Sequence, residues 1–279
     1  HCPKCQNNKA QNWLEKQQVA LLPTPYFLLT FTLPSEIARI ARSHQTLIYN
    51  LLFRISAAAT QQLADDPRFV GGRLGMIGVL HTWGRTLVYH PHVHYLIPAG
   101  GLASDKKTWM PARKNFLVPV KALSRLFRGK FRQALEREEI YNLVPTEVWT
   151  KDWVVHCEPV GSGEGALKYL APYIFRVAIS NNRILKLEDN HVTFRYRDTT
   201  SKKEKRCTLS VHEFIRRFLQ HVLPKGFVKV RYYGFFSPGL RKSLAVLRES
   251  LDELHGLSLP EQLDETETSP QIQDKTLAT

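Results

Sequence analysis

The segment His90-Pro-His-Val-His-Tyr-Leu-Ile-Pro-Ala-Gly-Gly101 joins a histidine-rich start to an apolar continuation. His92 and His94 bracket one apolar residue, Val93. Alternate side chains of a β-strand point to the same face, so a strand here would project both imidazoles together and turn Val93 into a core. Two imidazoles on one rigid strand form half of a metal site. The alternative is a solvated turn, which the apolar run Tyr95-Leu-Ile97 disfavours.

Two imidazoles bind a divalent ion weakly, so a third ligand is expected. His81 lies near the end of the preceding predicted strand, residues 74–83, and a polar turn at Gly84-Arg-Thr86 leads back to His92. A hairpin with this turn would place His81 opposite the histidine pair. A plain hydrogen-bonding role in the sheet is an equally weighted alternative for His81. His90 is a candidate for orienting one of the ligands from outside the metal's coordination sphere.

The rest of the chain mixes predicted strands and helices without strict alternation. Apolar periodicity and turn residues predict further strands at 24–33, 153–160, 184–187, 191–196 and 227–235, and helices at 11–22, 35–64, 119–141, 211–222 and 240–254. Residues 202–206 are predicted to form a charged loop, and the tail 258–279 to be disordered. This order favours an α+β fold, with an antiparallel sheet covered by helices.

Charge is distributed unevenly along the 279 residues. The formal net charge is +14; residues 249–279 hold eight acidic residues and one basic residue, which leaves +21 on residues 1–248. Such a basic body points to a polyanionic partner, most often nucleic acid. No apolar run approaches the roughly 20 residues of a membrane span. Four cysteines and no recognisable signal peptide predict a reducing compartment.

Candidate DNA contacts combine basic and aromatic side chains. The predicted helix 119–141 is strongly basic, and for it a solvated face and phosphate contact are equally weighted. Arg195-Tyr-Arg197 and Arg231-Tyr-Tyr233 mix both residue types on predicted strands, as single-strand binders do. Ordinary sheet packing is the favoured alternative for each of these residues singly. The candidates are Lys121, Arg125, Arg128, Arg132, Arg195 and Arg231.

Tyr169 and Tyr173 are four residues apart and would share one face of a helix. Phenols beside a metal site indicate nucleophilic attack on a phosphodiester, with the metal polarising the phosphate. A packing pair is the alternative, and for an isolated pair of tyrosines it is the stronger one. Pro172 complicates the geometry, because proline disrupts a helix interior. A helix that begins near Pro172 would leave Tyr169 on the approach loop.

The N-terminal His1-Cys-Pro-Lys-Cys5 resembles the end of a zinc-binding module. Structural zinc takes four ligands, and His1, Cys2 and Cys5 supply two or three of them. The sequence is therefore predicted to be a fragment of a longer protein. A complete chain that uses these residues without metal is the alternative.

These residues together carry a resemblance to the two-tyrosine HUH endonucleases. More closely, the chain resembles transposases of the ninety-one-type insertion sequences, which move by a rolling-circle route. The matching segments are TPYFLLTFTLP (24–34), HTWGRTLVYHPHVHYLIPAGGL (81–102), KYLAPYIFRVAISNNRI (168–184), EFIRRFLQHVLPKGF (213–227) and VRYYGFFSPGLR (230–241). HCPKCQ at the start matches the end of the family's zinc-binding module.

The resemblance implies a central antiparallel sheet flanked by helices, with the histidine pair on a middle strand. It implies that His92 and His94 bind Mg2+ or Mn2+, and that Zn2+ binds the complete N-terminal module. Tyr169 and Tyr173 take the nucleophile role: a tyrosine cleaves single-stranded DNA, becomes linked to its 5′ phosphate and frees a 3′ hydroxyl. The partners are single-stranded DNA at the element ends and target, and host replication proteins. The location is the bacterial cytoplasm, at the nucleoid.

The expected organisation has four parts: residues 1–22 end the zinc module, 23–240 form the catalytic domain, 241–257 form a helix and 258–279 form the acidic tail. Three other functions stay open. One is a catalytically inactive DNA-binding remnant, favoured by the missing N-terminal ligands. Another is a replication initiator or relaxase with the same chemistry. The third is a metal phosphoesterase, which would have no use for the two tyrosines.

Overall fold

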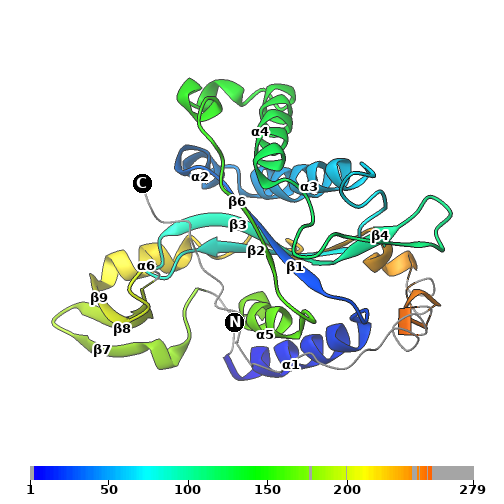
Figure 1. Ribbon diagram of the computed structural model, residues 1–279. Helices are drawn as coiled ribbons and strands as arrows, with labels where there is room; N and C mark the ends of the chain where they lie inside the picture. The colour runs from blue at the N-terminus through cyan, green and yellow to red at the C-terminus, as the bar shows by residue number, and fades with distance from the viewer. Residues whose placement is uncertain are drawn as a thin grey trace.

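A five-stranded antiparallel sheet lies between two layers of helices in the computed structural model (Figure 1). The structure describes residues 3–175, 178–198, 200–240, 244, 246–249 and 251–252, and it leaves out the side chains of residues 3–7, 172, 173 and 175. Within these residues the predicted α+β class, with its central antiparallel sheet, is confirmed. None of the described helices combines the length and the apolar character needed to cross a membrane.

The strand order of the central sheet places the histidine-rich strand in the middle. The order is β10 (Val230–Tyr233), β2 (Met76–Trp83), β3 (Tyr89–Pro98), β1 (Tyr26–Thr32) and β6 (Val155–Pro159). Each strand pairs antiparallel with its neighbours. β1, β2 and β3 are covered on both faces, so nearly all of their residues are buried.

Two hydrophobic cores lie on the two faces of the sheet. α2 (Ser35–Ala41), α3 (Gln45–Ala64) and α4 (Val120–Arg137) cover one face, and α1 (Pro3–Ala20) and α5 (Glu164–Phe175) cover the other (Figure 1). Side chains of β1 alternate between them: Phe27, Leu29 and Phe31 join the first core, whereas Tyr26 and Leu28 join the second. Full burial of such side chains contributes about 1.5–3 kcal/mol each.

A second, three-stranded sheet packs beside the central one. It consists of β7 (Ile184–Glu188), β8 (His191–Arg197) and β9 (Glu204–Ser210), and α6 (Val211–Leu219) contacts it. The predicted hairpin at 184–196 is confirmed. Residues 202–206 were predicted to form a charged loop. This prediction is wrong for Glu204–Arg206, which is part of β9 and pairs with β8.

Other element boundaries differ from the predictions. The helix predicted over 35–64 is two helices, and between them the Ser43 hydroxyl donates to the Ile40 carbonyl at 3.1 Å and competes with helical pairing. The helix predicted at 11–22 begins earlier, at Pro3. A hairpin of β4 (Gly100–Leu102) and β5 (Trp109–Pro111) was not predicted. The predicted disordered tail 258–279 lies outside the described residues.

A glycine turn sets α5 against the sheet. Gly163 has φ +82°, and a Cβ there would lie 2.8 Å from the Tyr26 ring, so the position requires glycine. α5 begins directly after it, at Glu164, and passes through Pro172. The alternative in which this helix starts near Pro172 is therefore wrong, and Tyr169 lies on the helix.

Candidate metal centre and active site

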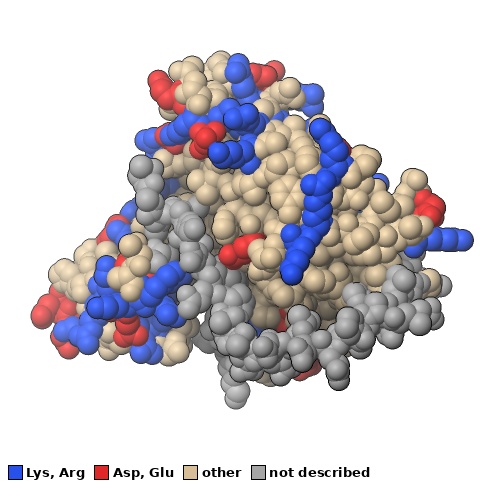
Figure 2. Space-filling model, viewed as in Figure 1, with Lys and Arg blue, Asp and Glu red and all other residues tan. Residues whose placement is uncertain are grey.

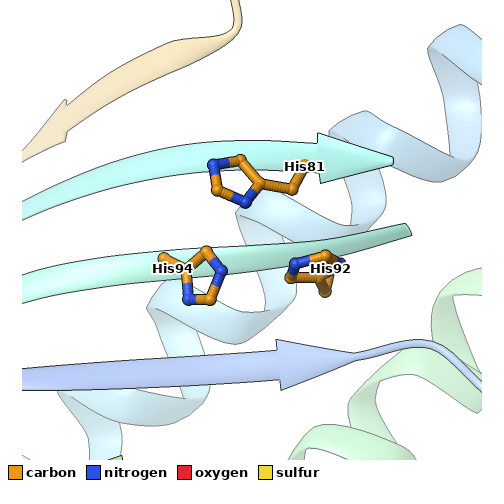
Figure 3. A group of neighbouring side chains, drawn as sticks. All are labelled: His81, His92 and His94. Atoms are coloured by element: carbon orange, nitrogen blue, oxygen red, sulfur yellow. The ribbon is translucent and has the colours of Figure 1, made fainter. Parts of the chain in front are cut away.

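Three buried histidines converge on the α5 face of the central sheet. His81 on β2 lies directly opposite His92 on β3, and His94 follows two residues later on the same face (Figure 3). Their potential ligand atoms all lie within 4.8 Å of one another. Among the described residues this is the only group of three or more His, Cys, Asp or Glu side chains arranged to hold one ion. The predicted juxtaposition of His81 with the pair is confirmed; its role as a ligand stays a prediction.

The rings are held edge to face. Centroids of His81 and His94 are 4.7 Å apart, those of His92 and His94 are 4.9 Å apart, and those of His81 and His92 are 5.2 Å apart. Interplanar angles between 70° and 87° turn the nitrogens of neighbouring rings toward a shared point rather than stacking the rings. Trp83 stacks on His81 at 5.7 Å between centroids and helps to shield that imidazole from water.

Hydrogen bonds orient two of the imidazoles. The Nδ1 of His92 lies 2.6 Å from the His90 carbonyl, and because a carbonyl only accepts, Nδ1 carries the proton. The lone pair of the neutral ring is then on Nε2. His94 Nδ1 is 2.8 Å from the Thr30 hydroxyl of β1. Such supporting bonds are typical of histidines that bind metals. The predicted orienting role of His90 therefore falls to its backbone carbonyl.

The electrostatics of the cluster favour a neutral imidazole at His81. Burial holds the pKa of His81 well below its usual range, and the neighbouring His94 and His92 rings and Lys229 lower it further. Neutral imidazole is the form that binds metal ions. Burial also lowers the pKa of Lys229, to about 8, and its ammonium lies 4.9 Å from the centre of the Trp83 ring.

A buried hydroxyl on the strand next to the cluster fits a bound ion with its water. Thr32 lies opposite His92 on β1 and is 3% exposed. Its hydroxyl oxygen has no hydrogen-bond partner among the described residues. A buried hydroxyl without a partner costs about 1–3 kcal/mol, which a metal-bound water would relieve. Three imidazoles and this hydroxyl together form a donor set that fits a divalent cation.

Tyr169 reaches the cluster from α5. Its ring centre is 6.2 Å from that of His94, in an edge-to-face contact at 87°, and it packs against the second core. The predicted partner, Tyr173, is one helical turn further along α5, and its side chain lies outside the described residues. Of the predicted zinc ligands, His1 and Cys2 lie outside the described residues, as does the side chain of Cys5.

The histidines open onto a cavity of about 230 Å³. His81, His92 and Tyr169 line it from the central sheet and α5. A second wall comes from Arg85 of the β2–β3 turn, Arg183 just before β7, and Tyr196 and Arg197 of β8. Arg85 and Arg183 were not predicted as site residues, and Arg195 was predicted instead of its neighbour Arg197. The one available signal was the mixed basic and aromatic composition of residues 195–197.

None of the six predicted DNA contacts lines this cavity. Four of them, Lys121, Arg125, Arg128 and Arg132, are on α4, across the sheet from the histidines. Arg231 also faces that side, over the Phe53 ring of α3 at 4.4 Å and bonded to Asn50. Arg195 lies 3.6 Å from Glu204. Basic groups cover both the α4 layer and the second sheet in Figure 2, with acidic groups among them. DNA contact by these six residues stays a prediction.

Three converging histidines on the central antiparallel sheet, faced by a tyrosine-bearing helix, define a class: α+β proteins whose histidine cluster is compatible with an HUH motif. Two family models match the chain. One, described as "Putative transposase", covers residues 75–243, and the other, described as "Transposase zinc-binding domain", covers residues 1–33. The chain belongs to this transposase family, and the resemblance to transposases of the ninety-one-type insertion sequences is confirmed.

Two curated relatives agree with this assignment. The chain is 40% identical over 296 aligned residues to "Putative transposase y4qJ" of Sinorhizobium fredii, an alignment that covers 99% of this chain and 73% of that protein. It is 28% identical over 255 residues to "Transposase for insertion sequence element IS801" of Pseudomonas savastanoi pv. phaseolicola, covering 85% of this chain and 60% of that protein. No solved structure matches the chain.

Proposed function

We propose that this transposase cleaves and rejoins single-stranded DNA through a covalent tyrosine link, in rolling-circle transposition. The observation that carries the proposal is the position of Tyr169. Its ring meets the edge of His94 and shares one cavity with His81 and His92. A nucleophile beside a candidate metal centre is the arrangement that phosphodiester cleavage requires.

In the proposed reaction the Tyr169 oxygen attacks the scissile phosphorus, and the bond from phosphorus to the 3′ oxygen breaks. The phenol loses its proton to water, and the departing 3′ oxygen takes up a proton. The products are a 5′-phosphotyrosine and a free 3′ hydroxyl, so a later attack by a 3′ hydroxyl rejoins the strand and restores the phenol. Tyr173 is proposed as the second nucleophile, on sequence grounds alone.

His81, His92 and His94 are proposed to hold the metal. A bound divalent ion would polarise the phosphate and stabilise charge on the departing oxygen. The chain's own contribution is positional, since Thr30 and the His90 carbonyl fix the rings of His94 and His92. Resemblance favours Mg2+ or Mn2+, whereas an all-imidazole set suits Zn2+ better. For the N-terminal segment we propose Zn2+, in keeping with its match to a zinc-binding domain.

The proposed partners are single-stranded DNA at the element ends and target, together with host replication proteins. The proposed site of action is the bacterial cytoplasm, at the nucleoid. The basic charge of residues 1–248 supports a polyanionic partner.

The test incubates the purified chain with labelled single-stranded DNA that spans an element end, with Mn2+, Mg2+ or Zn2+. A denaturing gel should show a covalent protein–DNA band that chelation removes. His92→Ala should abolish the band, and Tyr169→Phe should abolish or strongly reduce it, whereas Tyr173→Phe tests the second nucleophile. Tyr141→Phe is the matched control, because Tyr141 stacks on Trp149 away from the histidines.

Two outcomes contradict the proposal. DNA binding without a band in any metal, for this chain and for a version extended by a complete zinc module, would favour an inactive DNA-binding protein. Strand cleavage that persists in Tyr169→Phe and Tyr173→Phe without a covalent band would favour a metal phosphoesterase.

A further inference from the structure

The wall of the cavity that faces the histidines is unusually basic. Arg85, Arg183 and Arg197 contribute to it, and no aspartate or glutamate is among the lining residues in the part of the chain that the structure describes. Guanidinium groups bind phosphate oxygens through paired N–H donors, which makes arginine well suited to phosphate recognition. The cavity thus brings phosphate-binding chemistry next to the tyrosine proposed to attack a phosphate.

Hydrogen bonds to backbone carbonyls hold this wall in place. Arg85 donates to the Arg197 carbonyl at 2.7 Å. Arg183 donates to the Arg195 carbonyl at 2.9 Å and to the Arg85 carbonyl at 2.7 Å. Carbonyls are neutral acceptors, so these bonds fix the arginines without cancelling their charge. Arg195 differs, because its guanidinium lies 3.6 Å from the Glu204 carboxylate.

The β2–β3 turn in this wall is anchored at three consecutive carbonyls. The Arg85 carbonyl accepts from Arg183. The Thr86 carbonyl accepts from Arg217 of α6 at 3.1 Å, and the Leu87 carbonyl accepts from His221 at 3.1 Å. The donors come from three separate positions between residues 183 and 221. A turn held this firmly keeps Arg85 at a set position relative to His81, four residues earlier on β2.

The aromatic content of the cavity points to its ligand. Tyr196 adds an aromatic ring beside the arginines. A phosphate on guanidinium groups with a base on an aromatic ring is the usual way in which proteins hold an unpaired nucleotide.

We propose that Arg85, Arg197 and Tyr196 bind the nucleotide adjoining the phosphate that Tyr169 attacks, with Arg183 positioning the backbone at Arg85 and at Arg195. This inference rests on the proposed function, and it names the residues that select a single strand. The DNA strand then passes between the central sheet and the β7–β8–β9 sheet.

The experiment measures binding of fluorescently labelled single-stranded DNA by anisotropy, in a chelator so that no cleavage occurs, over salt concentrations from about 50 to 200 mM. Arg85→Gln and Arg197→Gln should each weaken binding about tenfold and reduce the slope of log affinity against log salt by about 0.7. Tyr196→Ala should weaken binding at least about fivefold with the slope unchanged. The affinity for duplex DNA of the same sequence should change little in these three variants.

The matched control is Arg206→Gln. Arg206 has the same charge and lies exposed on β9 of the same sheet, but it does not line the cavity. This variant should stay within about twofold of the wild type. Arg85→Lys, which keeps the charge, should keep the salt slope, and thermal melting of every variant checks the fold.

The outcomes separate this inference from the proposed chemistry. If the wild type forms the covalent band but the Arg85 and Arg197 variants bind and react like Arg206→Gln, the nucleotide site is overturned and the chemistry stands. If no band forms from this chain or from the version extended by a complete zinc module, but the salt slopes fall as stated, the nucleotide site is supported and the chemistry is refuted. Failure of the wild type to bind single-stranded DNA overturns both.

Discussion

Metal binding at the histidine cluster should be measurable as thermal stabilisation. His81, His92 and His94 are 2%, 4% and 2% exposed, so the site exists only in the folded chain. A metal at a hundred times its dissociation constant then adds about 2.7 kcal/mol to the free energy of unfolding. For a chain of this size each kcal/mol raises the melting temperature by about 2–4 °C. We therefore expect Mn2+ or Zn2+ to raise it by roughly 5–10 °C.

The perturbation is His81→Phe, which keeps a planar ring and removes both nitrogens. Without metal this variant should melt at or above the wild-type temperature, because burying a phenyl ring avoids the desolvation of the polar imidazole nitrogens. With metal present, the variant should lose most of the rise in melting temperature that the wild type shows. Scanning calorimetry with and without chelator measures both effects.

A matched control excludes adventitious binding. His191 is exposed on β8, so His191→Ala should keep the full metal-induced shift. An undiminished shift in His81→Phe would refute His81 as the third ligand. No shift in the wild type with Mn2+, Mg2+ or Zn2+ would refute the metal centre itself.

Three further predictions follow from single contacts. Burial lowers the pKa of His221 to about 4, against about 6.5 in the unfolded chain, so on acidification the unfolded chain takes up the proton first. The free energy of unfolding should therefore fall by up to about 3 kcal/mol between about pH 6.5 and 4. Urea unfolding of His221→Gln should show a smaller dependence of this free energy on pH. An equally steep profile would contradict this. Gly163→Ala combines a positive φ with a clash against a buried ring and should cost about 2 kcal/mol or more in urea unfolding. Gly129→Ala, in open space on α4, should instead stabilise by about 0.5–1 kcal/mol, and equal effects would argue against the strain. Thr30→Val removes the hydroxyl beside His94 and should weaken metal binding at least about tenfold by calorimetric titration; unchanged affinity would mean that this bond does not orient the ring.

The centre of the fold was predictable because its signals are local. Strands β1, β2 and β3 are short apolar runs bounded by turn residues, and the hairpin between β2 and β3 fixes their pairing. The i, i+2 spacing of His92 and His94 then places both on one face, and the turn length brings His81 opposite them. Each of these inferences uses residues close in sequence, for which strand periodicity is sufficient.

The wall of arginines was not predictable because it depends on long-range packing. Arg85 and Arg197 are 112 residues apart, and only the docking of the second sheet joins them. Hydrophobic periodicity also does not predict which face of the sheet a helix covers. The basic helix α4 was therefore an even-odds candidate for phosphate contact, and it covers the face of the sheet opposite the histidines.

The β2–β3 turn links stability to the proposed chemistry. Its carbonyls accept bonds from Arg183, Arg217 and His221, so a loss at any one of these donors loosens the turn that carries Arg85. Protonation of His221 near its lowered pKa of about 4 removes Nδ1 as an acceptor for the Thr82 hydroxyl, but it keeps the Nε2–H bond to the Leu87 carbonyl. The anchor on the turn therefore persists in the protonated ring, and His221 links this turn to the pH dependence of stability rather than to that of DNA binding.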